Sequence, residues 1–390
     1  MNPPKKGDPG IQRGSIIIYR VYDVCEEINL VMVEKCLANH KGPLKFNVPK
    51  FIDRALVVRN PPLQFGLGDR SISICGKEFR CEVRTKIRDF GVVSIVLEVS
   101  IPPQMRWSGL VELGAALEEG SEVDELTGQI LPGIVAAIRP AMQVPNPSIL
   151  GGAVGGATPG GEARAGTDLV LFEDYIVYLI ETFVEELPID KFLSEVDVAS
   201  LILAEHEVTL SQRSRDVALE NIFQYGEKDL AVVDWNSALV IEPGGGHEIP
   251  DILEFAVTQL LEMRYYDDLI NEKLKDLYGR IGDRGRGFLT NRYGKLYKEA
   301  SARFIEFTEF LERVENSLKV VGDFYLATIY RAATRKFRLS DWQNSVTRKI
   351  NILGQVSSLL QGEVNNRRSQ LMELVIALLI LYEVIAAVMK

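Results

Sequence analysis

The last twenty residues limit the possible folds of this chain more than any other part of it. Of the nineteen residues from Leu371 to Met389, seventeen are apolar, and the two exceptions are Glu373 and Glu383. A helix of this length can span a bilayer, although a bilayer opposes the insertion of carboxylates. Residues 371–389 are therefore expected to form either a membrane helix or a helix buried in a bundle.

The apolar stretch continues a heptad pattern that begins about thirty residues earlier. Ser340 and Gln343 form a capping box, which predicts the start of a last helix that can run to Val388. Most of its a and d positions are apolar, as in a coiled-coil seam. These positions are Val346, Ile350, Leu353, Ser357, Leu360, Val364, Arg367, Leu371, Leu374, Leu378, Leu381 and Ile385.

The helix before it is predicted from about Asn291 to Lys336, with an apolar stripe of its own. Two such helices joined by a short turn would form a long antiparallel hairpin, roughly 65 Å in length at 1.5 Å per residue. Half of each stripe would remain uncovered. We therefore expect the chain to self-associate through residues 304–385, unless lipid or the N-terminal part covers them.

Glu373 and Glu383 are candidate functional carboxylates. They lie ten positions apart, which places them about 80° apart around a helix. In lipid, Glu383 would lie near mid-depth at a cost of about 2–3 kcal/mol, which the Leu, Ile and Val residues of the stretch can offset. In a bundle, both carboxylates would instead pair with Lys or Arg of a neighbouring helix.

The residues before these helices alternate strand and helix signals, so we predict an α+β fold. Residues 15–145 are interpreted as one α+β domain. Its predicted elements are a strand at 15–19, a helix from the Asp23 capping box to about 37, a hairpin at 72–83, a strand at 90–97 and helices at 110–117 and 122–138. Residues 169–249 are interpreted as a second α+β segment, with a strand at 175–180, helices at 188–204 and 214–224 and a hairpin at 230–241.

Three further segments complete the predicted organisation. Residues 1–14 read as a disordered tail, with no secretory signal or transit peptide. Residues 146–168 are glycine-rich and read as a flexible linker, since they lack the side chains needed for a core. Residues 250–390 are predicted to be helical, beginning with a striped helix at 252–278.

Basic residues gather in two places, at 279–303 and 331–349, although the net charge of the chain is −10. Arg284 and Arg286 in the first cluster, and Arg335, Lys336 and Arg338 in the second, are candidate residues for binding an anion or an acidic partner. Such clusters suit RNA, an acidic protein or anionic lipid headgroups. They equally suit a solvated helix end paired with the acidic part of the chain. No DNA-binding signature is present.

No motif for a reaction, a metal or a cofactor is found. His206-Glu207 and His247-Glu248 lack the second histidine of a zinc protease motif, and no phosphate loop or serine nucleophile motif occurs. Four cysteines are expected to be reduced thiols of a cytoplasmic protein, and Cys75 and Cys81 could face each other across the 72–83 hairpin. We therefore expect no catalytic residue, no metal and no cofactor.

Three stretches of the chain are similar to the YagE-type family, which includes the "required for meiotic nuclear division" proteins and is a domain of unknown function. Residues 372–384 resemble the family's closing apolar helix with two acids ten residues apart. Ala256 and Gln259 match its Ala-Leu-Ala-Gln helix, and residues 90–95 resemble its aromatic-Gly-apolar strand. The resemblance implies association with membranes and support of organellar translation, without known catalytic residues.

The sequence thus favours a non-catalytic scaffold that associates with a membrane and assembles through its C-terminal helices. The expected location is the cytoplasm, with attachment to the inner membrane through residues 371–389. An RNA- or ribosome-associated factor that uses the two basic clusters is the alternative. An enzyme of unknown type is the third hypothesis.

Overall fold

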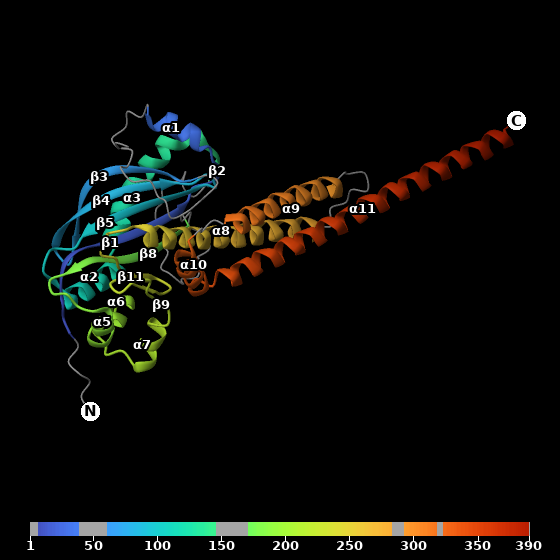
Figure 1. Cartoon of the computed structure of the whole chain (residues 1–390). Coiled ribbons are helices and arrows are strands. Elements are labelled where there is room, and N and C mark those ends of the chain that lie inside the picture. Colours follow the sequence, from blue (N-terminus) through green and yellow to red (C-terminus); the bar gives the residue numbers. More distant parts are fainter. Residues whose placement is uncertain (1–6, 39–60, 146–170, 283–291, 318–322, 390) are drawn as a thin grey trace. The chain divides into compact units, whose positions relative to one another are not determined.

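The computed structural model describes residues 7–38, 61–145, 171–282, 292–317 and 323–389, which form two units (Figure 1). Unit 1 holds residues up to Glu262 together with Lys319–Ser340. Unit 2 holds Met263–Leu318 and Asp341–Lys390. The α+β class predicted from the sequence is confirmed, because a mixed sheet is followed by helices.

Unit 1 is built on a nine-stranded sheet. Its strands run in the order β3-β4-β5-β1-β8-β11-β10-β9, and β6 pairs with the start of β1. The bounds are β1 (Gly10–Asp23), β3 (Leu63–Ile74), β4 (Lys77–Ile87), β5 (Val92–Ser100), β6 (Met105–Arg106), β8 (Phe172–Phe183), β9 (Ile222–Phe223), β10 (Leu230–Val233) and β11 (Ser237–Ile241). A separate two-stranded sheet joins β2 (Cys25–Ile28) to β7 (Met142–Pro145).

Strand β1 unites the two segments that the sequence analysis treated separately. It pairs antiparallel with β5 on one edge and with β8 on the other, and β8 pairs in parallel with β11. Residues 15–145 and 169–249 therefore share one sheet. The predicted tail at 1–14 is also shorter than expected, since β1 begins at Gly10 and Ile11 is fully buried. The predicted linker at 146–168 lies outside the described residues.

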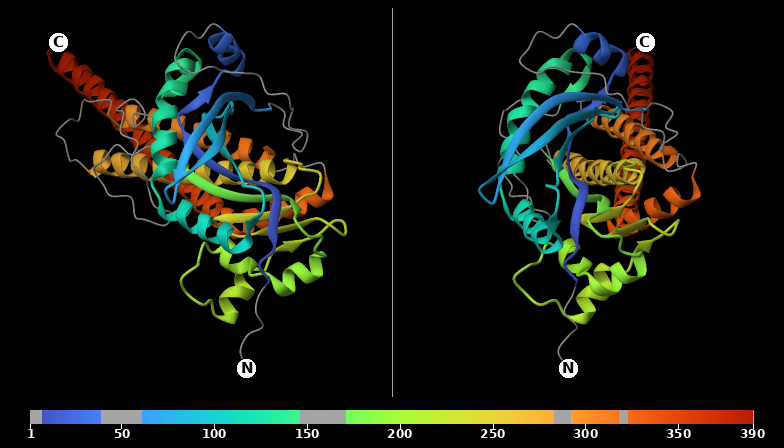
Figure 2. Two further views of the ribbon diagram at one scale, coloured as in Figure 1. Left: turned by 90° about the vertical axis from the view of Figure 1, so that its left-hand side faces the viewer. Right: turned by 60° about the vertical axis from the view of Figure 1, so that its left-hand side comes forward.

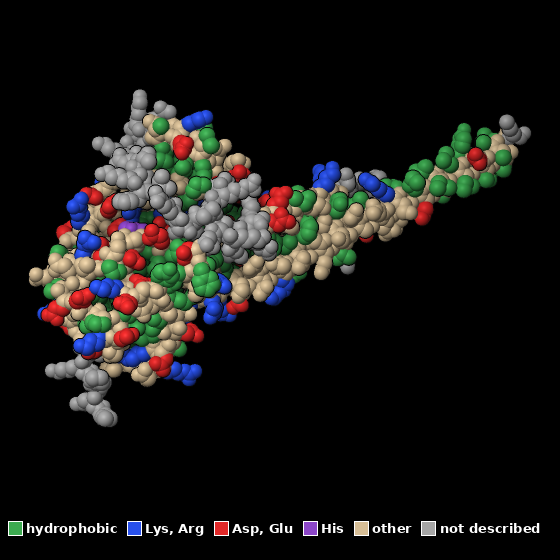
Figure 3. All heavy atoms as spheres, viewed as in Figure 1, with side chains coloured by type: hydrophobic (Ala, Val, Ile, Leu, Met, Phe, Trp, Pro, Cys, Tyr) green, Lys and Arg blue, Asp and Glu red, His purple; other side chains and the backbone are tan. Residues whose placement is uncertain are grey.

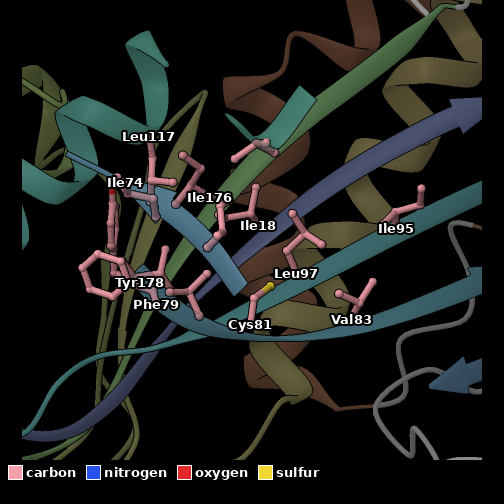
Figure 4. Close-up of a cluster of buried hydrophobic side chains, with 14 of the residues drawn as sticks. Ile18, Ile74, Phe79, Cys81, Val83, Ile95, Leu97, Leu117, Ile176 and Tyr178 are labelled. Carbon is pink, nitrogen blue, oxygen red and sulfur yellow. The ribbon is translucent and has the colours of Figure 1, made fainter. Parts of the chain in front are cut away.

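Helices cover both faces of this sheet (Figure 2). Alternate residues of each strand, such as Ile16 and Ile18 of β1, form the main core with α2 (Trp107–Glu119) and α3 (Glu122–Ile138). Figure 4 shows part of this core, in which Ile18, Leu97 and Ile176 of neighbouring strands and Leu117 of α2 belong to one apolar cluster. The shorter helices α1 (Leu30–Ala38), α5 (Ile189–Glu195), α6 (Val198–Ile202) and α7 (Gln212–Ala218), a 3-10 turn (Arg139–Ala141) and α10 (Phe324–Lys336) complete unit 1.

Two local predictions about unit 1 are corrected. The helix expected from Asp23 begins only at Leu30, because β1 extends to Asp23, and the Asn29 side chain accepts the N–H of Met32 at 3.0 Å. The 72–83 hairpin is confirmed, but Cys75 lies in its two-residue turn and Cys81 pairs with Arg70. Cys75 and Gly76 have φ values of 51° and 70°, as a type I′ turn requires. The two cysteines therefore do not face each other.

Unit 2 contains the second part of α8 (Glu248–Gly282), α9 (Arg292–Ser317) and most of α11 (Leu339–Val388). Helices α9 and α11 are antiparallel, as predicted. Ser301 lies 2.8 Å from Ser357, and the Arg367 guanidinium lies 4.3 Å from the Tyr293 ring centroid. Helix α8 runs parallel to α11, where Asp267 accepts from Ser345 at 2.7 Å and pairs with Lys349 at the same distance.

The predicted 45-residue partner of α11 is corrected. Helix α9 ends at Ser317, and a separate helix α10 begins at Phe324 with its N-terminus capped by Asp323. The Asp323 carboxylate accepts the N–H of Leu326 at 3.0 Å, which starts a new helix rather than continuing α9. Of these two helices, α9 belongs to unit 2 together with most of α11, whereas α10 belongs to unit 1.

Candidate functional site

The C-terminal part of α11 has apolar side chains on every side, and all of its described residues are exposed. It belongs to the one helix within the described residues that is long and apolar enough to cross a membrane, and no residue of its most apolar stretch is buried. Figure 3 shows hydrophobic side chains along the visible face of this end, with an acidic side chain among them. A helix that is apolar all round normally lies in a protein core or in lipid.

The burial of the heptad positions changes along α11. Val346, Leu353 and Leu360 are at most 4% exposed, so this part of the predicted seam is confirmed as a packed face within unit 2. Leu371 is 43% exposed and Leu381 is 54% exposed. The seam is therefore buried in the N-terminal part of α11 and exposed to solvent in its C-terminal part.

Arg367 marks the end of the packed part of α11. Its Nε lies 3.3 Å from Glu363, and its guanidinium stacks over Tyr293 of α9. The candidate carboxylates Glu373 and Glu383 follow, both exposed, and neither forms an ion pair with another described residue. Within the described residues of unit 2, no helix supplies the cation that a bundle helix would need at these positions.

The candidate basic residues do not form one patch. Lys336 is inside unit 1, where its Nζ lies 3.1 Å from Asp234 and 3.2 Å from Glu220 and donates to the Val217 carbonyl. Arg335 is exposed, whereas Arg338 lies just past α10 with a φ of 54°. Arg284 and Arg286 lie outside the described residues. Lys336 thus pairs with acidic residues of its own unit.

A cluster of buried charges between β4 and α8 was missed by the sequence analysis. Lys86 is 3% exposed, and its Nζ lies 2.6 Å from both Asp251 and Glu254. Arg88, which directly follows the last residue of β4, lies 3.6 Å from Glu254 and stacks over Phe255. Burial disfavours the Lys86 cation, but the two carboxylates outweigh it and raise the Lys86 pKa.

Glu98 of β5 extends this cluster. Its carboxylate accepts from Ser15 at 3.0 Å, pairs with Arg84 and lies 3.4 Å from His247 Nε2. Burial favours the neutral acid, yet the His247 and Arg84 contacts prevail and lower the Glu98 pKa to about 2. The hydrogen bond with Glu98 raises the His247 pKa, mainly because it stabilises the imidazolium.

These buried charges hold the first part of α8 on the sheet. Glu254 is fully buried, so no substrate reaches it, and its two cations leave it ionised with a lowered pKa despite burial. The signal in the sequence was Arg84-Thr85-Lys86-Ile87-Arg88, in which every second residue of a buried strand is a cation. Among the described residues, no group of three or more His, Cys, Asp or Glu side chains could hold a metal ion.

Fold and site define a class: an α+β protein with a mixed sheet and an apolar, exposed helix end. No solved structure matches the chain. The family described as "Uncharacterized protein MJ0711, N-terminal domain" matches residues 13–150 and 163–248, more than half of the chain. The chain belongs to this family. The matched residues include β1 to β11 but end at the start of α8.

One curated protein is similar to more than half of the chain. "Uncharacterized protein MJ0711" of Methanocaldococcus jannaschii is 24% identical over 220 residues, which cover 56% of this chain and 66% of the relative. The expected membership of the YagE-type family is wrong, because the matching family is a different one. Two of the three stretches behind that expectation, at 256–259 and 372–384, lie outside the family match and are apolar patterns that many helices share.

Proposed function

We propose that this chain is a non-catalytic scaffold anchored in a membrane by the C-terminal end of α11. The observation that carries the proposal is the exposure of every apolar residue from Leu371 to Val388, on all sides of the helix. Water is a poor solvent for such a surface, and apolar exposure at this scale marks a site that lipid or another protein covers. Lipid suits a surface with no polar side, because a protein partner would cover only one stripe.

Length and composition support insertion. Residues 371–388 measure roughly 26 Å along the helix at 1.5 Å per residue, close to the thickness of a bilayer's hydrocarbon core. They include five leucines, three isoleucines and three valines. At about −0.3 to −0.6 kcal/mol each, these residues contribute roughly −3 to −7 kcal/mol, against about 3 kcal/mol for one charge near the centre. Glu373 lies within one turn of the entry point, where a charge costs less.

The orientation follows from the flanking cations. Arg367 and Arg368 lie shortly before the apolar stretch. Under the positive-inside rule, the N-terminal side of the span stays in the cytoplasm. The scaffold would then hold its sheet unit at the cytoplasmic side of the inner membrane.

Self-association belongs to the same proposal, but through a shorter surface than the 304–385 region expected from the sequence. Because the heptad positions Val346, Leu353 and Leu360 are covered within unit 2, copies would meet through the remaining exposed residues of α11. Glu383 is a polar side chain deep in the apolar stretch, and polar groups in lipid are stabilised by hydrogen bonds between helices. We expect Glu383 of two copies to lie in contact.

Fractionation tests the anchor. The full chain and a chain that ends at Ser369 are expressed under identical conditions, and the membrane pellet and supernatant are compared. The full chain is expected in the pellet and the shorter chain in the supernatant, since the shorter chain keeps Arg367 but lacks the apolar residues. The same distribution for both chains would refute the anchor.

A further inference from the structure

A small cleft opens in unit 1 between α10 and the end strand β9. It has a volume of about 250 Å³, and its lining includes Asn221, Ile222, Phe223, Thr328, Arg331 and Arg335. All of these residues belong to unit 1. The cleft is independent of the apolar end of α11 and of the buried charges beneath α8.

Two arginines of α10 give the cleft its charge. Arg331 and Arg335 are four residues apart, so they lie on the same side of the helix, and both are exposed. Arg331 donates to the Ala327 carbonyl at 3.1 Å and to the Thr328 hydroxyl at 3.3 Å, which fixes its side chain over the cleft. The Arg335 guanidinium forms no hydrogen bond or ion pair with another described residue. Like charges at this spacing destabilise a helix, so helix stability does not explain the pair.

Asn221 adds a neutral polar residue to the lining of the cleft. It is only 8% exposed, and its backbone carbonyl accepts the N–H of Val233 at 3.0 Å. Its side-chain amide makes no hydrogen bond to the described part of the chain. An amide has two N–H donors, so this side chain can donate to an anion in the cleft.

The acidic residues near the cleft do not cancel its positive charge. Glu220 also lines the cleft, but Lys336 lies 3.2 Å from it and 3.1 Å from Asp234. Lys336 therefore compensates part of this acidic charge, and Arg331 and Arg335 remain available to an anion. A guanidinium presents parallel N–H groups that match the oxygens of a phosphate.

We propose that this cleft binds a phosphate monoester through Arg331, Arg335 and the Asn221 amide. The guanidinium groups contact the phosphate oxygens, and the amide donates a further hydrogen bond. Ile222 and Phe223 offer apolar contact to the carbon atoms next to the ester oxygen. The volume is below that of pockets for drug-sized ligands, so the cleft holds a phosphate with a few carbon atoms rather than a whole nucleotide.

Calorimetric titration of the full chain in detergent tests the proposal. The probes are glycerol 3-phosphate and, in mixed micelles, phosphatidic acid, which carry the same monoester on a soluble molecule and on a lipid. If one probe binds at least tenfold more tightly than the other, the result supports the site and identifies whether the ligand is a soluble molecule or a lipid. Failure of both probes to bind overturns it.

Two double variants locate the binding. Arg331→Gln with Arg335→Gln should weaken binding of the preferred probe at least tenfold. Arg213→Gln with Arg338→Gln removes the same charge from exposed residues outside the cleft and should change binding less than twofold. Equal weakening in both variants would show that charge alone attracts the probe and would overturn the site.

A single variant and a competitor complete the test. Asn221→Asp places a carboxylate beside the phosphate and should also weaken binding at least tenfold, while the thermal transition shows whether the variant is folded. If Asn221→Asp is unfolded, the two double arginine variants alone test the site. A single-stranded RNA without terminal phosphates should not compete with the monoester probe for the cleft. If the RNA displaces the probe, the proposal is overturned in favour of a phosphodiester site.

Discussion

Replacement of Lys86 by methionine should destabilise unit 1 strongly. The side chains are similar in length, but the variant leaves Glu254, which is fully buried, with only the more distant Arg88 as a cation at 3.6 Å. Removal of one partner of a buried ion pair costs roughly 3–5 kcal/mol, because the other charge stays desolvated. At about 2 °C for each kcal/mol in a domain of this size, the thermal transition should fall by roughly 6–10 °C.

A matched control lies on the same strand and the same face. Arg80 pairs with Asp69 at 2.6 Å, the distance found for Lys86, but the two side chains are 76% and 51% exposed. Exposed ion pairs contribute about 1 kcal/mol or less, so Arg80→Met should lower the transition by no more than about 2 °C. Differential scanning calorimetry of the full chain in detergent measures both variants. Equal losses would refute the argument that burial, rather than pairing, sets the cost.

The stabilisation by Lys86 should not diminish as the pH rises from 7 to 9. Its carboxylate partners raise the Lys86 pKa, so the stabilisation is fully present below the ordinary lysine pKa of about 10.4 and is lost only as the pH rises through the raised value. In the unchanged chain Glu254, with a lowered pKa, loses its contribution only as the pH falls below the ordinary range for glutamate. A difference between Lys86→Met and the unchanged chain that shrinks as the pH rises from 7 to 9 would contradict the assignment.

Three further outcomes are expected. His247→Gln should destabilise the chain mainly below about pH 6.5 and progressively less as the pH rises through the raised His247 pKa, because the bond to Glu98 needs the imidazolium; melting temperatures from pH 5.5 to 8.5 measure this. Gly114→Ala would place a Cβ atom 2.4 Å from the buried Tyr178 hydroxyl and should cost about 1–3 kcal/mol by calorimetry. Leu353→Ala should cost about 2–5 kcal/mol and lower the transition of unit 2, since Leu353 is 2% exposed.

Individual helices and strands could be predicted from the sequence where a neighbouring turn or a regular apolar pattern defines them. The hairpin of β10 and β11 and the helix α3 lie where turn residues and apolar periodicity indicated them. The prediction of a helix from Asp23 was wrong. Asp and Glu three residues apart occur in many contexts besides a capping box, and pairing of β1 with β5 and β8 extended the strand to Asp23. Tertiary pairing outweighed the local signal.

The arrangement of segments could not be predicted from periodicity. Pairing of β1 with β8 joins residues separated by 150 or more positions, and no local pattern encodes such a contact. The heptad pattern correctly identified Val346 to Leu360 as a packed face but did not show where the partner helices end. The buried cluster at Lys86 was missed because a charge on a strand is normally an exposed charge, and its partners Asp251 and Glu254 come from a distant helix.

Insertion of the end of α11 into a membrane is tested most directly by carbonate extraction of full-length variants. Leu378→Arg with Leu381→Arg shifts the insertion free energy by roughly 6–8 kcal/mol, enough to cancel the contribution of the apolar residues. Leu359→Arg with Gln361→Arg adds the same charge at exposed positions of the same helix outside the span. We predict that the unchanged chain and the 359/361 variant resist extraction and that the 378/381 variant is released. Release of all three chains, or of none, would contradict the anchor.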